Sequence, residues 1–381
     1  MDEMQVYKGR GTADMRDDFL DFINYVFGFN GNGEDFLKLL PKLYKEEYHP
    51  CENNYVVTEN GKLKAAIGVF PRTMQVLDET LSVHGVGNVA VHPYSRSKGY
   101  KNDLLYKAVQ DMIDAGADFA DLGGLRQRYQ YFSYEIAGTC INFDFSGTSM
   151  RHCFGDSPRK DMDFVPVTDA ESPWLDSIRE LHAKKLLRVN RPAEQFFDIV
   201  RSWQKTLHVI LEEDRFVGYC IDALEELTLV DAEADYVDVL RSYVAKRGNV
   251  TLHLPLHETV MIEKSYKICS HFSMGNDQNY SIFHYKKVLN AFLKLKAAVL
   301  PLMDGTLTVQ VDGIAGREIL KITVQDGKPT VEDTEEAPQI VLEHKEAASF
   351  FFGLVSPART ACPTSAAWFP LPLRMYGADH V

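Results

Sequence analysis

The chain has 381 residues, of which 45% are hydrophobic, 11% aromatic and 25% charged. This composition excludes a disordered or fibrous protein, and the length predicts two or three domains at roughly 100–200 residues each. A net charge of −13 argues against a binder of nucleic acid or of anionic membranes and favours a cationic small substrate.

Cysteine usage and the N-terminal residues indicate the compartment. The six cysteines are scattered without a C-x-x-C pair, and we interpret them as reduced thiols. The opening residues lack the basic and apolar segments of a signal peptide, and no apolar run reaches the roughly 18–20 residues of a spanning helix. We therefore expect a cytoplasmic protein whose partners include neither membrane nor nucleic acid.

Residues 1–150 predict a mixed α/β domain. Apolar residues at helical spacing between 15 and 48, interrupted by Gly28, Gly31 and Gly33, predict two helices joined by a glycine-rich loop. Strands are expected at 55–58, 63–69, 74–77, 83–91, 119–122 and 141–145. Two helices stand among these strands, one with an apolar stripe over 104–113 and a short one at 126–132.

Residues 151–288 partly repeat this order. Helices are expected near 173–187, 193–205 and 234–246, and strands at 207–212, 216–221, 226–230 and 250–254. We interpret this region as a degenerate second copy. The turn before the last helix is Asp231-Ala232-Glu233, which is acidic and has no glycine.

Residues 289–381 change character. Clean alternation over 307–311 and 320–324 predicts an antiparallel sheet, with a helix at 347–354. The tail that follows is apolar and free of like-charge blocks, so we expect it to pack into the molecule.

One turn carries the strongest functional signal. Arg96, Ser97, Lys98, Gly99, Tyr100 and Lys101 stand between a strand and a helix. Free N–H groups and the positive end of the helix dipole make such a turn a pyrophosphate site, to which the basic side chains add charge. A solvated basic cap is the alternative interpretation.

Together with the strand Asn88-Val89-Ala90-Val91, this turn resembles the acetyl-CoA motif of GCN5-related N-acetyltransferases, the GNAT superfamily. The resemblance implies that acetyl-CoA is the cosubstrate, that Val89, Ala90 and Val91 line its pantetheine, and that Asn88 lies at the substrate. The sequence departs from the motif at Lys101, where Gly or Ala is usual, which puts the closest contact between backbone and phosphate in doubt.

A second motif, residues 128–135, resembles the "F-Y-x-x-x-G-F" segment of that superfamily, with Ser133 in place of the glycine. The resemblance implies that Tyr129 protonates the departing thiolate. A phenol with a pKa near 10 is suited to that task. Tyr131 and Tyr134 are the rivals for this role.

The layout resembles the Eis (enhanced intracellular survival) acetyltransferases. It implies an α+β fold of two tandem GNAT-like mixed α/β domains, 1–150 and a degenerate 151–288, followed by a sterol carrier protein-like domain, 289–381. It also implies a homo-oligomer and a catalytic base in the α-carboxylate of Val381. Asp379 or His380 could supply the base instead.

The expected activity is acetyl transfer to a cationic amine: an aminoglycoside, a polyamine or a lysine side chain. Phe29, Glu34 and Asp35 in the glycine-rich loop are candidate substrate contacts, and a surface loop without a role in binding is the alternative interpretation. No metal is expected, since His253 and His257 flank Pro255 in a strand that separates them by roughly 13 Å. The competing hypothesis is a non-enzymatic acyl-CoA sensor or lipid-binding protein.

Overall fold

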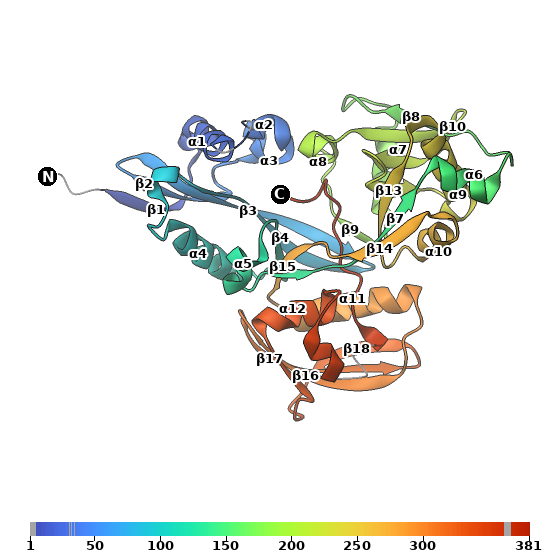
Figure 1. The fold of residues 1–381 in the computed structure, drawn as a ribbon. Helices are drawn as coiled ribbons and strands as arrows, with labels where there is room; N and C mark the ends of the chain where they lie inside the picture. The colour runs from blue at the N-terminus through green and yellow to red at the C-terminus, as the bar shows by residue number, and fades with distance from the viewer. Residues whose placement is uncertain (1–4, 30, 32, 34, 362–366) are drawn as a thin grey trace.

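The structure is a computed structural model that describes residues 5–29, 31, 33, 35–361 and 367–381. Across these residues the chain is a mixed α/β protein with four sheets (Figure 1). No helix in the described ranges is both long enough and apolar enough to cross a membrane.

The largest sheet has eight strands, in the order β1-β2-β3-β4-β5-β15-β6 with β9 beside β3. They are β1 (Val6–Arg10), β2 (Asn54–Glu59), β3 (Lys62–Val76), β4 (Glu79–Val91), β5 (Phe119–Leu122), β6 (Glu135–Ala137), β9 (Leu187–Val189) and β15 (Gln278–Ile282).

β3 is one long strand, although the sequence predicts two. Its outer edge pairs with β2 as far as Gly68 and with β9 from Met74, so residues 70–73 have a strand neighbour only in β4. Pro71 lies in this gap. Proline is tolerated there because no neighbouring strand needs the N–H that it lacks.

Helices cover both faces of this sheet (Figure 1). On one face lie α1 (Arg16–Gly28), α2 (Phe36–Leu39) and α3 (Pro41–Tyr44), packed on a core that includes Ala90. On the other lie α4 (Tyr100–Asp114) and α5 (Arg126–Tyr129), packed on a core that Val89 and Val91 border. The buried face of α4 confirms the predicted stripe, since Leu104, Leu105, Ala108, Val109 and Met112 are all buried.

Three strands cross the predicted boundary at residue 150: β9, which lies beside β3, and two more. β7 (Cys140–Phe145) pairs with β13 (Val250–Pro255) and β14 (His271–Gly275), whereas β15 returns to the first sheet between β5 and β6. Pairing between strands more than 100 residues apart leaves no local signal, so the sequence predicts the strands without their partners.

The rest of the middle region surrounds the sheet β12-β11-β10-β8. Its elements are α6 (Gly147–Phe154), β8 (Asp163–Pro166), α7 (Leu175–Ala183), α8 (Phe196–Arg201), β10 (Leu207–Glu212), β11 (Arg215–Ile221), β12 (Glu226–Leu229), α9 (Ala232–Arg247) and α10 (Thr259–Ile268). The acidic turn before α9 caps this helix itself, because the Asp231 carboxylate accepts from the Ala234 N–H at 2.9 Å.

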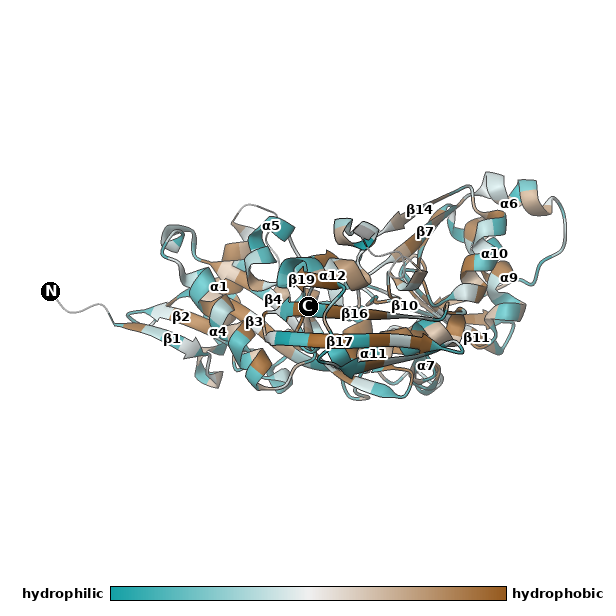
Figure 2. Ribbon diagram, turned by 90° about the horizontal axis from the view of Figure 1, so that it is seen from below, coloured by the Kyte–Doolittle hydropathy of each residue, from teal (hydrophilic) through white to brown (hydrophobic). Residues whose placement is uncertain are grey.

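The last region places α11 (Tyr285–Val299) and α12 (His344–Phe352) against the sheet β18-β17-β16-β19. The strands are β16 (Gly305–Gly313), β17 (Gly316–Gln325), β18 (Lys328–Asp333) and β19 (Ile340–Glu343). β17 alternates between apolar and polar residues, as Figure 2 shows.

Residues 367–381 form what we call the C-terminal tail. Its first part is buried in the core of the last region through Trp368, Phe369, Leu371 and Leu373. The tail then runs to the first sheet and ends between α3 and α8 (Figure 1).

Candidate active site

β4 leads through an exposed basic turn into α4. Arg96, Ser97, Lys98 and Gly99 are exposed, and Gly99 has a φ of 83°, a left-handed conformation that favours glycine. The positive end of the dipole of a 15-residue helix therefore faces an accessible turn. Lys98 is held by Glu59, whose Oε1 lies 2.6 Å from its Nζ. These residues fit a pyrophosphate.

An opening between two parallel strands continues from the turn. β4 pairs with β5 only over 83–86, whereas β4 extends to Val91. In the described part of the chain, the side of residues 87–91 that faces β5 therefore has no strand partner. A register shift lies here, and Asn88 has a φ of 53°. The backbone N–H and C=O groups along such an unpaired edge can form hydrogen bonds with an extended ligand, as they would with an added strand.

Asn88 itself is buried, and its Nδ2 donates to Asn54 Oδ1 at 2.9 Å. Its Oδ1 is buried without a partner among the described residues. A role for Asn88 at the substrate stays a prediction.

Tyr129 lies beside the turn. The Lys101 Nζ lies 5.7 Å from the centroid of the Tyr129 ring, so the residue that departs from the motif links the turn to this tyrosine. Burial raises the pKa of Tyr129 and keeps its hydroxyl protonated at neutral pH. The rival Tyr134 is fully buried, and Tyr131 is 63% exposed. Tyr129 is therefore the one of the three that combines a raised pKa with contact to the basic turn.

The C-terminal tail is held by its carbonyl groups. The Lys42 Nζ donates to the carbonyls of Ala378 and His380 at 2.5 and 2.6 Å, and Trp203 Nε1 donates to His380 at 3.1 Å. Arg72 donates to the carbonyl of the residue between them. Burial lowers the pKa of Lys42 to about 7. Three side chains from distant elements thus fix the last residues in place.

A buried ion network fixes the tail through Asp379. Arg191 donates to both Asp379 oxygens at 2.8 and 2.9 Å, and to Glu226 at 2.6 Å. Lys185 and the Tyr219 hydroxyl also bind Glu226, at 3.0 and 2.6 Å. Burial alone would raise the pKa of Asp379, but Arg191 outweighs it and holds that pKa below its usual range. Asp379 is thus an anchor rather than a free base.

His380 lies between two buried carboxylates. Its Nδ1 is 3.5 Å from Asp121 and its Nε2 is 3.8 Å from Asp277. Burial alone would lower the pKa of His380, but the two carboxylates raise it to about 9. The ring is therefore cationic at neutral pH and is not a ready base.

The last residue reaches β4 where that strand begins to leave β5. A Cβ added to Gly87 would lie 3.1 Å from the carboxyl carbon of Val381, and one added to Gly85 would lie 2.6 Å from a Val381 methyl group. The Val381 carboxylate forms no ion pair with any described residue. A carboxylate without a cationic partner keeps its oxygens available to accept a proton from a reacting group.

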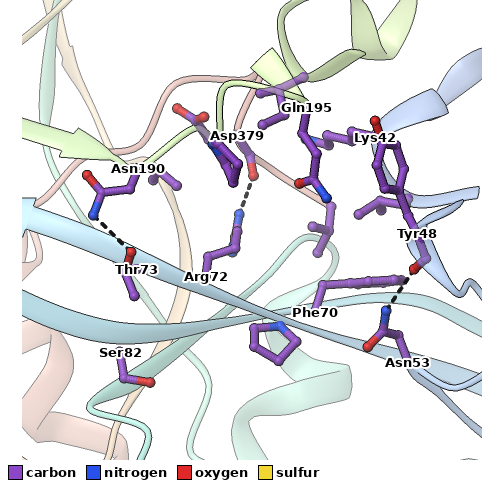
Figure 3. Close-up of a pocket in the computed structure, with 16 residues that line it drawn as sticks. Lys42, Tyr48, Asn53, Phe70, Arg72, Thr73, Ser82, Asn190, Gln195 and Asp379 are labelled. Carbon is purple, nitrogen blue, oxygen red and sulfur yellow. Dashed lines mark hydrogen bonds between the residues drawn. The ribbon is translucent and has the colours of Figure 1, made fainter. Parts of the chain in front are cut away.

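A cavity of about 460 Å³ opens beside Val381 (Figure 3). Its floor is residues 70–73, the part of β3 without an outer neighbour. Its lining is Lys42, Leu43, Tyr48, Asn53, Phe70, Pro71, Arg72, Thr73, Ser82, Val189, Asn190, Pro192, Gln195, Ile199, Asp379 and Val381.

Phe29 and Asp35, two of the loop residues predicted as substrate contacts, are not among the described residues that line this cavity. Phe29 is 45% exposed at the end of α1, and Asp35 caps α2 and pairs with Lys38 at 3.0 Å. Glu34 lies outside the described residues. Their contact with the substrate stays a prediction.

Sequence reasoning missed the residues that hold the tail, above all Lys42, Arg72 and Arg191. No motif marks them, because each stands alone in the sequence. The available signal was weak: an arginine or lysine within an apolar stretch needs a buried partner when the chain folds.

Residues 10–137 match the model of the acetyltransferase (GNAT) domain. No curated protein matches the sequence. The chain therefore carries a GNAT acetyltransferase domain over its first third, and the protein is an N-acetyltransferase.

Solved structures extend the likeness to the whole chain. Those similar to it include a GCN5-related N-acetyltransferase from Anabaena variabilis (TM-score 0.68), a probable N-acyltransferase from Enterococcus faecalis (0.66) and Eis1 from Mycobacterium abscessus (0.64). Each is 13% identical, and each alignment covers 99% of this chain and 100% of the other. This likeness shows the fold, and it confirms the prediction of tandem GNAT-like mixed α/β domains.

Proposed function

We propose that the protein transfers an acetyl group from acetyl-CoA directly to an amine held in the cavity beside Val381. The observation that carries this proposal is the seat of Val381 on β4, at the mouth of the opening that leads to the basic turn. The net charge predicts a cationic amine: an aminoglycoside, a polyamine or a lysine side chain.

The turn and the opening would hold the cosubstrate. Arg96, Lys98 and the N–H groups at the start of α4 would bind its pyrophosphate, and the backbone at Val89 and Val91 its pantetheine and thioester carbonyl. The second copy offers no equivalent site, because Asp231 occupies the start of α9 with its own carboxylate.

The reaction requires two proton transfers. The neutral amine forms a C–N bond with the thioester carbonyl carbon while the C–S bond breaks. Val381 accepts the proton that the amine nitrogen loses, and Tyr129 donates a proton to the departing thiolate. Solvent then returns the proton from Val381 to Tyr129, which restores both groups. Holding the two reactants in line supplies much of the acceleration.

The middle and last regions would serve this site as supports. The middle region supplies Arg191, Trp203 and part of the cavity wall, and the last region carries the tail to the site. The resemblance of the last region to sterol carrier proteins would then concern its fold rather than a lipid ligand, because its core is filled by Trp368 and Phe369 of the tail.

Thiol release from acetyl-CoA, followed with a panel of amines, tests the proposal. Tyr129→Phe and deletion of Val381 should each lower kcat by roughly 10²–10⁴-fold, the contribution of a positioned acid or base. Val381→Ala is the control for the deletion, because it keeps the terminal carboxylate in place. Tyr134→Phe is the control for the hydroxyl. Unchanged turnover in Tyr129→Phe and in the deletion variant would contradict the mechanism.

A further inference from the structure

The charges around the cavity are already paired. Asp379, its acidic lining side chain, binds Arg191, and Asp198, which lies behind Tyr48, pairs with Lys45 at 2.5 Å. Among the described lining residues, the Val381 carboxylate is therefore the one acid without a cationic partner.

The other ionisable side chains on the lining are basic: Arg72, and Lys42, whose pKa of about 7 leaves it partly neutral at neutral pH. Arg72 is bound by Asp121 and by the tail, and Lys42 donates to two tail carbonyls. The remaining lining is apolar or carries neutral amides and hydroxyls: Leu43, Tyr48, Asn53, Phe70, Pro71, Thr73, Ser82, Val189, Asn190, Pro192, Gln195 and Ile199. Among the described lining residues, a second ammonium group in this cavity would meet basic side chains and amides but no second free carboxylate.

We propose, on the basis of the function above, that the acceptor of this cavity is a monoamine: one amino group on an apolar stem, as in a lysine side chain, rather than a polyamine or an aminoglycoside. The single amino group would lie at Val381, and the stem would lie against Phe70, Pro71 and Ile199. The net charge of −13 resides elsewhere on the protein and does not make this wall acidic.

The physical reason is desolvation. An ammonium group that leaves water is compensated best by a carboxylate, and an ammonium group that meets only neutral amides and hydroxyls beside basic side chains is disfavoured by comparison. An apolar stem needs only an apolar wall, which the cavity offers. Discrimination of this kind comes from what the site lacks as much as from what it contains.

Two amines of equal length test the inference. Heptylamine and hexane-1,6-diamine differ in one end, a methyl group in the first and an ammonium group in the second. We expect kcat/KM to be at least about tenfold higher for heptylamine than for hexane-1,6-diamine, a ratio typical of one misplaced group in an apolar pocket.

A negative charge added to the cavity wall provides a second test of the inference. Gln195 is half-buried and directed toward the cavity (Figure 3). Gln195→Glu should therefore raise kcat/KM for the diamine, and the ratio of kcat/KM for heptylamine to kcat/KM for the diamine should fall at least about threefold. Gln325→Glu is the matched control, because it adds the same charge at an exposed residue at the end of β17.

The outcomes separate the two proposals. A diamine turned over as well as heptylamine, or a ratio that Gln195→Glu changes no more than Gln325→Glu does, would overturn the monoamine inference and leave acetyl transfer intact. Turnover of neither amine, nor of a lysine peptide or spermidine, would overturn the proposed function and the inference with it.

Discussion

Replacing Arg191 by methionine should destabilise the protein and inactivate it together. The side chain is fully buried between Asp379 and Glu226, whose side chains are 2% and 1% exposed. With Lys185, these four groups carry two positive and two negative charges, so the network is neutral. Methionine fills a similar volume but leaves one negative charge without a partner in the interior.

The expected cost follows from that imbalance. Removing one partner of a buried ion pair costs about 3–5 kcal/mol, a large share of the roughly 5–15 kcal/mol that stabilises a typical domain. Because Asp379 is two residues from Val381, the loss should also release the tail and lower kcat. Urea unfolding gives the free energy, and thiol release gives kcat.

Two further variants test whether the buried unpaired charge causes the loss of stability. Arg201→Met removes an exposed arginine of α8 and should change the free energy of unfolding by less than about 0.5 kcal/mol. Arg191→Met combined with Asp379→Asn and Glu226→Gln removes both carboxylates that Arg191 binds, but leaves Lys185 without its carboxylate partner. It should therefore recover only part of the loss. A loss below about 1 kcal/mol in Arg191→Met would refute the argument.

Three other predictions concern pH, the tail and the turn. Because the pKa of His380 is raised to about 9 in the fold, from about 6.5 unfolded, its stabilisation of about 3 kcal/mol is complete below pH 6.5 and is lost as pH rises through 9. The difference in Tm between wild type and His380→Gln should therefore shrink from pH 6 to pH 9.5, and a constant difference would contradict the pairing. Gly87→Ala should displace Val381 and lower kcat about tenfold or more, with Tm nearly unchanged, and an unaltered kcat would count against the seat of the carboxylate. Glu59→Gln should release Lys98 toward the cosubstrate and lower KM for acetyl-CoA by up to about fivefold in steady-state assays at low salt, whereas a raised KM would mean that Glu59 holds the turn in its binding shape.

The sequence predicts what short segments determine. The apolar stripe of α4 and the order of strand, basic turn and helix around Gly99 are local features, which is why both were predicted correctly. The path of the tail was expected only in outline, from its apolar composition and the family resemblance. Its anchors could not be predicted, because Arg191 and Asp379 are 188 residues apart and nothing near either one specifies the other.

The prediction of two strands in place of β3 was wrong for a related reason. Pro71 is compatible with a continuous strand only because the outer neighbours β2 and β9 stop on either side of it. That arrangement depends on a strand more than 110 residues further along the chain. The cavity floor is a consequence of the same gap, so the part of the site that sequence reasoning missed is the part built by long-range pairing.

The exchange of β7 and β15 between sheets affects how the protein is made. During synthesis, the first sheet lacks a strand between β5 and β6 until residues 278–282 emerge, and β7 waits for β13 and β14. Long-range pairing of this kind folds slowly and exposes strand edges that promote aggregation. A fragment that ends at residue 150 would keep both open edges permanently, so we expect it to aggregate more readily than a fragment that extends to the end of β15.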